Sequence, residues 1–421
     1  MNRATLRAVL TPRFGIMLPL GFASGLPLAL TGGTLQAWLT EAGLDLTTIG
    51  LFAYVGLPYT LKFLWAPVMD RIVPPWLGHR RGWMIVTQTG LALALTLMAF
   101  IGPGSGAQIF AALALGVAFL SASQDIVFDA YRTDLLKPDE RGLGAATWVM
   151  GYRIAMMASG SLALIVAARL GWSSAYLCMA GLMALGIVTI LMIPEPEAAR
   201  AAPQSMSEAV WGPLSEFLSR PMALALLGLI VLYKLGDAFA GALTTSFLLR
   251  GMAFSSEDIG LVRAFGIGAT ILGAFIGGGM MPQLGLFRSL MVFGVLQALS
   301  NLSFLWLAWA GKSYAVMAFA VGFENLTGGM GTAAFVALVM SLCNHRYTAT
   351  QFALLSSVEA LGRVFLGWPA AKLVGLAGWG PFFFVTFLAA LPGLWLLWVL
   401  RKPVTQHAEL NAGREGAEVP C

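Results

Sequence analysis

The fold is decided by residues 107–129, which read AQIFAALALGVAFLSASQDIVFD. This stretch is long and apolar enough to cross a bilayer, whose hydrocarbon core is about 30 Å thick. It also carries Asp125 and Asp129, which are one helical turn apart and therefore share one face of a helix. Carboxylates that face lipid are costly, so we expect both to face a bundle interior or a water-filled cavity. Ionisable residues at this depth are functional candidates by default.

The composition extends this interpretation to the whole chain. Hydrophobic residues make up 58% of the 421 residues and charged residues only 11%, with a mean hydropathy of +0.80. No soluble domain keeps so apolar a surface in solution. The sequence therefore predicts an all-α membrane protein with about twelve transmembrane helices of ~20 residues each. The apolar runs lie near 14–38, 47–69, 82–101, 107–133, 143–168, 173–193, 221–248, 256–281, 289–310, 313–341, 349–375 and 380–400.

Loop charges predict the orientation. If both termini are cytoplasmic, the inner loops and tails hold sixteen lysines and arginines, whereas the outer loops hold three: Arg169, Arg250 and Lys312. This asymmetry follows the positive-inside rule. The net charge of +5 then reflects orientation in the membrane, and we expect no nucleic-acid partner.

The motifs that the sequence lacks narrow the function classes. There is no Walker loop, so ATP is not the expected energy source. The three cysteines and three histidines are scattered and form no disulfide, metal-ligand or catalytic pattern. We therefore expect no enzyme activity, no metal and no cofactor, with the proton gradient as the energy source.

The one long polar stretch between spans divides the chain into two halves. We expect a six-helix bundle over 1–193, a cytoplasmic linker over 194–220, a second six-helix bundle over 221–401 and a polar cytoplasmic tail over 402–421.

The two halves also match weakly at a constant offset of 210 residues. TIGL at 48–51 aligns with DIGL at 258–261, and Arg153 aligns with Arg363. A duplication of six spans is typical of secondary transporters, whose substrate site lies near the membrane midplane.

Charged residues within the spans predict a polar pathway. Asp237, Glu324 and Asp125 would form a descending ladder of carboxylates, as a proton relay needs, because a carboxyl group in a partly dry cavity can load and release protons near neutral pH. Lys62 and Lys234, together with Arg153, would attract an anionic substrate.

An alternative interpretation is structural pairing. Lys234 and Asp237 are i,i+3 neighbours, and Glu359 and Arg363 are i,i+4 neighbours, so each couple could be a self-contained ion pair on its own helix. The sequence leaves both interpretations open.

The loop between the second and third spans carries Asp70-Arg71 and then Arg80-Arg81. It partly resembles the acidic–basic signature that latches the cytoplasmic face in the major facilitator superfamily, although Pro74-Pro75 interrupts the spacing. The alternative is a positive-inside anchor. Asp129 near the inner interface could take part in gating or bridge two helices.

Longer strings resemble the AmpG muropeptide permeases of Gram-negative inner membranes, from about Thr11 to Arg401. The strings are GFASGLPLAL (21–30), LQAW (35–38), KFLW (62–65), RRGW (80–83), SASQDIVFD (121–129), VLYKLGDAF (231–239), FENL (323–326) and QFALLS (351–356).

This resemblance implies a major facilitator fold in the inner membrane and proton-coupled import by alternating access. The implied cargo is N-acetylglucosaminyl-1,6-anhydro-N-acetylmuramyl peptides, which are recycled from the cell wall. Such a cargo is a bulky disaccharide with peptide carboxylates, so cationic, amide, hydroxyl and aromatic side chains suit it. We expect a monomer whose other partner is the lipid bilayer.

Combining the buried charges with the resemblance assigns provisional roles. The proton-coupling candidates are Asp125, Asp237 and Glu324. The substrate-binding candidates are Lys62, Gln124, Tyr152, Arg153, Tyr233, Lys234, Asn325 and Arg363. The gate candidates are Asp70, Arg81 and Asp129.

Two departures from the family pattern stand out. Better-known members carry further C-terminal spans where this chain has a polar tail, and Glu359 stands where a small or polar residue is expected. Two other functions stay open: an importer of the same fold for another bulky ligand such as a siderophore, and a membrane sensor that binds muropeptide without moving it.

Overall fold

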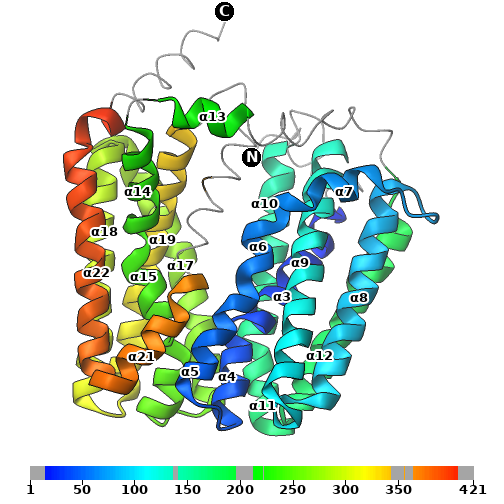
Figure 1. Ribbon diagram of the computed structural model, residues 1–421, viewed down its shortest axis with the longest axis horizontal. Helices are drawn as coiled ribbons and strands as arrows, with labels where there is room; N and C mark the ends of the chain where they lie inside the picture. The colour runs from blue at the N-terminus through cyan, green and yellow to red at the C-terminus, as the bar shows by residue number, and fades with distance from the viewer. Residues whose placement is uncertain are drawn as a thin grey trace, which may run out of the picture. The chain divides into compact units, whose positions relative to one another are not determined.

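The protein was analysed as a computed structural model that describes residues 15–135, 141–195, 212–220, 222–342, 355 and 364–405. Every regular element within these ranges is a helix, which confirms the predicted all-α fold class (Figure 1). Ten of the described helices are long and apolar enough to cross a membrane. The two other predicted spans are 47–69, which is divided into short helices, and 349–375, of which the described part is mainly one helix at its end.

The first half contains the elements of six predicted spans. They are α3 (Met17–Thr31), α4 (Gly33–Glu41), α5 (Leu46–Leu51), η1 (Phe52–Gly56), α6 (Leu57–Leu61), η2 (Lys62–Leu64), α7 (Ala66–Arg71), α8 (His79–Ile101), η3 (Pro103–Ser105), α9 (Ala107–Leu135), α10 (Arg141–Met157), the π-helix η4 (Ala158–Leu162), α11 (Ala163–Leu170) and α12 (Trp172–Met192).

The second half begins with a short helix before its spans. Its elements are α13 (Gly212–Leu218), α14 (Ala223–Tyr233), α15 (Leu235–Gly241), α16 (Thr244–Ser246), the π-helix η6 (Phe247–Gly251), α17 (Ser256–Leu284), α18 (Leu286–Ala310), α19 (Tyr314–Leu342), α21 (Gly367–Ala377) and α22 (Trp379–Val399).

Several spans are interrupted inside the apolar stretch. Pro58 and Pro67 stand in the first turns of α6 and α7, where a missing backbone N–H is tolerated, and so they separate the pieces of the second span. The seventh span breaks at Lys234, between α14 and α15. Irregular backbone at membrane depth is tolerated only where protein or water satisfies it, and such breaks are where transporters place their binding sites.

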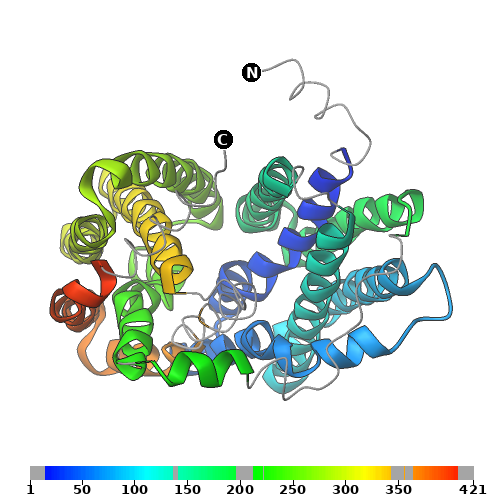
Figure 2. The ribbon, with the colours of Figure 1, turned by 90° about the horizontal axis from the view of Figure 1, so that it is seen from above.

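The chain forms two compact units that differ from the two sequence halves. Unit 1 contains the described residues of 1–45, 54–204 and 255–264, and unit 2 contains those of 46–53, 205–254 and 265–421. Each unit therefore takes up one short segment from the other half. Viewed along their helices, both units are bundles (Figure 2).

Polar contacts join segment 255–264, which includes the start of α17, to the rest of unit 1. Glu41 accepts hydrogen bonds from Ser256 and, at 2.7 Å, from the indole of Trp172. Arg169 forms an ion pair with Glu257. Unit 2 likewise includes segment 46–53 from the first half of the chain, and α5 in this segment packs against α21.

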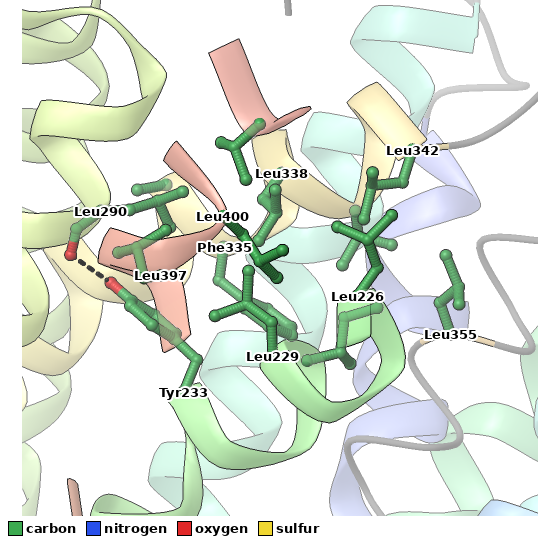
Figure 3. Packing of buried hydrophobic residues seen from close by; sticks show 14 of the residues in the cluster. Leu226, Leu229, Tyr233, Leu290, Phe335, Leu338, Leu342, Leu355, Leu397 and Leu400 are labelled. Atoms are coloured by element: carbon green, nitrogen blue, oxygen red, sulfur yellow. Dashed lines mark hydrogen bonds between the residues drawn. The ribbon is translucent and has the colours of Figure 1, made fainter. Parts of the chain in front are cut away.

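An apolar cluster fills the core of unit 2, where α14, α18, α19 and α22 lie side by side (Figures 1 and 3). Tyr233 and Phe335 stack with ring centroids 5.9 Å apart, and the Tyr233 hydroxyl donates to the Leu290 carbonyl oxygen at 2.9 Å. Unit 1 has a similar cluster that includes Phe128 and Trp148.

Glycines allow helices to approach backbone to backbone in both units. In unit 2, a Cβ atom added at Gly329 of α19 would lie 2.9 Å from the Ala274 backbone nitrogen of α17. In unit 1, a Cβ at Gly151 of α10 would lie 2.9 Å from the backbone nitrogen of Phe22 in α3. Small residues commonly line helix contacts in membranes, because lipid supplies no hydrophobic drive and association depends on close packing.

We expect Gly329→Ala to destabilise unit 2, because its Cβ would press on the α17 backbone. Overpacking of this kind costs about 1–3 kcal/mol of unfolding free energy. The measurement is the thermal unfolding midpoint of the purified protein in detergent. Gly328→Ala is the matched control, since a Cβ there meets only Gln297 Nε2 at an ordinary 3.6 Å. Equal midpoints for the two variants would refute the role of Gly329 in this contact.

Candidate transport site

The first cluster of polar groups surrounds Asp125 in unit 1. The half-buried Asp125 carboxylate of α9 accepts a hydrogen bond of 2.8 Å from the Ser24 hydroxyl of α3. Lys62 in η2 and Asp129 in α9 both act on Asp125 electrostatically. Because Lys62 follows the break in the second span, three predicted spans contribute to this cluster.

Further hydroxyls in this region were not predicted from the sequence. The Tyr59 hydroxyl of α6 lies 3.3 Å from the Thr31 hydroxyl at the end of α3, and Tyr59 is within electrostatic reach of Asp125. The Trp65 indole donates to the Ser123 hydroxyl at 3.0 Å. Serine, threonine and tyrosine are common in apolar helices, so Tyr59 is distinguished only by its proximity to Asp125.

Three further substrate-binding candidates, Gln124, Tyr152 and Arg153, also lie in unit 1. Gln124 is fully buried and its amide donates to the Ala23 carbonyl at 3.0 Å. Its side-chain oxygen has no hydrogen-bond partner among the described residues. The ring of Tyr152 packs closely over Gly25, and the half-buried Arg153 contacts the Met156 sulfur at 3.7 Å.

The three predicted gate residues differ in their surroundings. Asp129 is exposed and pairs with Arg132 at 3.1 Å, and the Arg132 guanidinium lies 5.1 Å from the Trp148 ring centre. Asp70 belongs to α7, but its side chain is outside the described part of the structure.

Arg81 has a well-defined structural position. Its guanidinium donates to the carbonyl oxygens of Ile190 and Leu191, at 3.0 Å each, in the last turn of α12. In return, the Glu195 carboxylate after α12 accepts the backbone N–H groups of Arg80 at 2.7 Å and Arg81 at 3.0 Å, in the first turn of α8. Each charge thus caps the helix end whose dipole it complements. A gating role for Arg81 stays a prediction.

The second cluster surrounds Lys234 in unit 2. The Lys234 ammonium, at the break between α14 and α15, lies 3.5 Å from the Asp237 carboxylate. It also donates to the Gln297 side-chain oxygen of α18 at 3.4 Å and to the Thr332 hydroxyl of α19 at 3.3 Å. The Lys234 side chain is only 12% exposed, so these groups replace its hydration shell. Gln297 and Thr332 were not among the residues predicted from the sequence.

Glu324 and Asn325 continue this cluster along α19. The Asn325 amide donates to the Glu324 carboxylate at 2.7 Å and to the Val321 carbonyl at 2.9 Å, and its side-chain oxygen accepts from Thr270 of α17 at 2.9 Å. Glu324 interacts electrostatically with both Asp237 and Lys234. The predicted residues Lys234, Asp237, Glu324 and Asn325 therefore lie in one polar region.

The structure describes only one of the two remaining substrate-binding candidates, Tyr233 and Arg363. The Tyr233 hydroxyl is occupied by the Leu290 carbonyl, and its ring belongs to the apolar cluster of unit 2 (Figure 3). Arg363 and its neighbour Glu359 lie outside the described residues. The roles assigned to both candidates remain predictions.

The chemistry of both clusters suits a polar, charged ligand. Each combines one lysine with carboxylates and hydroxyls at a discontinuity in a predicted span, and the second cluster also contains the amides of Gln297 and Asn325. Such groups can bind a carboxylate or sugar hydroxyls, and the carboxylates can exchange protons. Within the described ranges, no group of three histidine, cysteine or acidic residues is placed to hold a metal ion.

Known proteins are similar to this chain in sequence and in fold. The sequence profile of the Major Facilitator Superfamily matches residues 17–367. The anhydromuropeptide permease of Escherichia coli (strain K12) is 51% identical over 413 residues, which cover 98% of this chain and 84% of the permease. The candidate transporter AmpG 4 of Rickettsia conorii is 34% identical, over 91% of this chain and 95% of its own.

Among solved structures, the nucleoside transporter NupG superposes with a TM-score of 0.71. The match covers 93% of this chain and 100% of NupG at 14% sequence identity, so it demonstrates the shared fold alone. The chain belongs to the Major Facilitator Superfamily and, within it, to the family of the anhydromuropeptide permeases.

Proposed function

We propose that this protein imports N-acetylglucosaminyl-1,6-anhydro-N-acetylmuramyl peptides from the periplasm to the cytoplasm, driven by protons. The observation that carries the proposal is the 51% identity to the Escherichia coli anhydromuropeptide permease over 98% of the chain. Identity at this level along nearly the whole length includes the spans that supply both polar clusters.

The two polar clusters support the cargo assignment chemically. An anhydromuropeptide presents sugar hydroxyls, amides and peptide carboxylates. Lys62 and Arg153 in unit 1 and Lys234 in unit 2 supply positive charge for the carboxylates. Gln124, Asn325 and Gln297 supply amides, which can both donate to and accept from sugars and peptides.

The carboxylates support proton coupling. Asp125, Asp237 and Glu324 are held at membrane depth, each beside a hydrogen-bond donor or a lysine. Intramembrane acidic residues commonly form proton relays in transporters. Protonation of such a group changes its attraction for the neighbouring cation, which couples proton binding to cargo binding and to the conformational cycle.

The proposed location is the inner membrane of a Gram-negative bacterium, with both termini in the cytoplasm. This orientation is supported by the sixteen basic residues that it assigns to inner loops and tails, against three outside. We propose a monomer, because each half supplies its own polar cluster.

The proposal is tested by uptake of radiolabelled anhydromuropeptide into vesicles of purified protein, with and without an imposed inward proton gradient. We expect accumulation above equilibrium only with the gradient. Equilibration without accumulation would remove proton coupling. Binding without entry would favour the sensor. No muropeptide uptake in vesicles that do take up a labelled siderophore would favour the siderophore importer.

The carboxylates are tested one at a time. We expect Asp125→Asn and Asp237→Asn each to reduce gradient-driven accumulation by at least about tenfold, because an amide of the same shape cannot carry a proton in the relay. Asp134→Asn is the control on the same helix as Asp125, because within the described residues Asp134 is exposed and pairs with Arg80 at 3.2 Å, away from both polar clusters. Normal accumulation in both test variants, at wild-type levels in the membrane, would disprove the relay.

The Lys234–Asp237 couple separates function from structural pairing. If the pair were only structural, Lys234→Gln would lose transport because it leaves the buried Asp237 carboxylate uncompensated. The double variant Lys234→Gln, Asp237→Asn would then recover transport, because it removes both charges. We expect the double variant to stay inactive, because it lacks both the proton carrier and the cation for the cargo. The readout is initial uptake rate per folded protein, and recovery to near the wild-type rate would return the pair to a structural role.

A further inference from the structure

An open pocket lies between the helical turn that follows α22 and the beginning of α18, and it has no part in the proposed transport function. Its volume is about 330 Å³, and it is lined by Phe287, Arg401, Lys402 and Thr405. None of the four is acidic, and in the described part of the chain neither Arg401 nor Lys402 forms an ion pair with a carboxylate. Two cations at one pocket, without a carboxylate partner among the described residues, favour an anionic ligand.

The basic residues are held in place by the core of unit 2. Helical geometry continues over 401–405, beyond the end of α22 at Val399. Val404 is fully buried in the apolar cluster, and its N–H donates to Leu400 at 3.0 Å. The Arg401 guanidinium lies 5.2 Å from the ring centre of Trp398. The pocket is therefore a built feature of the fold, and both cations project from a helical turn that the core anchors.

The pocket stands at the end of an exposed apolar stripe of α22. The large exposed side chains of this helix recur at helical spacing, and Trp395 and Trp398 are 65% and 53% exposed. The stripe consists of Leu388, Leu391, Trp395, Trp398 and Val399. Arg401 and Lys402 follow the stripe in the chain, directly after the turn at Leu400 that ends α22. Tryptophan and basic residues in this order mark the boundary between hydrocarbon and headgroups.

The start of α18 adds further positive potential. Phe287 lies in the first turn of α18. The N-cap residue of this helix is Gly285, with a φ of 74°, and no side chain caps the helix start. The free N–H groups of a helix N-terminus favour anions, and phosphate in particular. Arg288 follows Phe287 and is exposed.

From the pocket, its two cations, the helix start and the apolar stripe, we propose that this junction binds the phosphate headgroup of an anionic phospholipid. The phosphodiester lies between Arg401 and Lys402, and the acyl chains follow the exposed stripe of α22. Free phosphate shares the charge of the headgroup, but it would leave the stripe without a role. This site lies outside the proposed transport function and does not depend on the identity of the cargo.

The test is native mass spectrometry of the full chain in detergent, titrated with phosphatidylglycerol and, separately, with phosphatidylcholine of the same acyl chains. We expect wild type to prefer phosphatidylglycerol and Arg401→Gln, Lys402→Gln to bind it about 25-fold more weakly, since each cation near an anionic lipid contributes roughly fivefold. The charge-preserving variant Arg401→Lys, Lys402→Arg should retain binding.

Lys372→Gln is the matched control, because Lys372 also lies over a tryptophan, Trp368, at 5.8 Å but does not line the pocket. We expect it to bind lipid as wild type does. The proposal is overturned if the double glutamine variant, with an unchanged unfolding midpoint in phosphatidylcholine, binds phosphatidylglycerol as wild type does. It is equally overturned if Lys372→Gln weakens binding as much, or if millimolar inorganic phosphate displaces the lipid, which would indicate a site for free phosphate.

Discussion

A lipid environment offers no hydrogen bonds, and the rest of this structure depends on that constraint. Backbone groups are satisfied within helices, so the described chain is helical wherever it is regular. The same constraint acts on side chains. Asp125 is bonded to Ser24, Lys234 to Asp237, Gln297 and Thr332, and Asn325 to Glu324 and Thr270. Each cluster combines charged and neutral polar groups, because several partners are needed to replace the lost water.

Breaks in the helices bring these polar groups together. The second span is divided by prolines next to Lys62, and the seventh span is interrupted at Lys234 itself. Such breaks are where transporters place their binding sites. In the proposed transport cycle, cargo and protons bind where the helices are interrupted.

Charged residues outside the clusters stabilise helix ends and segment contacts. Arg81 and Glu195 cap one another's helices, so α8 and α12 are joined by two reciprocal interactions at the same end. Glu41 holds the beginning of α17 against unit 1 through Ser256. These charges have a structural role at helix ends, whereas the transport roles of the clustered charges stay predictions.

The sequence by itself determined the helical membrane fold, because apolar length and the cost of exposed polar groups in lipid leave no other solution for most spans. It also predicted Lys234, Asp237 and Glu324 as functional candidates, because a charge within an apolar run is conspicuous, and Asn325 as the neighbour of Glu324. Only the tertiary structure decided that Gln297, Thr332 and Thr270 join them, since neutral polar residues gain meaning from neighbours far away in the chain. It also placed Tyr233 in an apolar core with its hydroxyl bound to Leu290, and Arg81 at the end of α12. Partner choice of this kind depends on packing between helices, which periodicity along one helix does not encode.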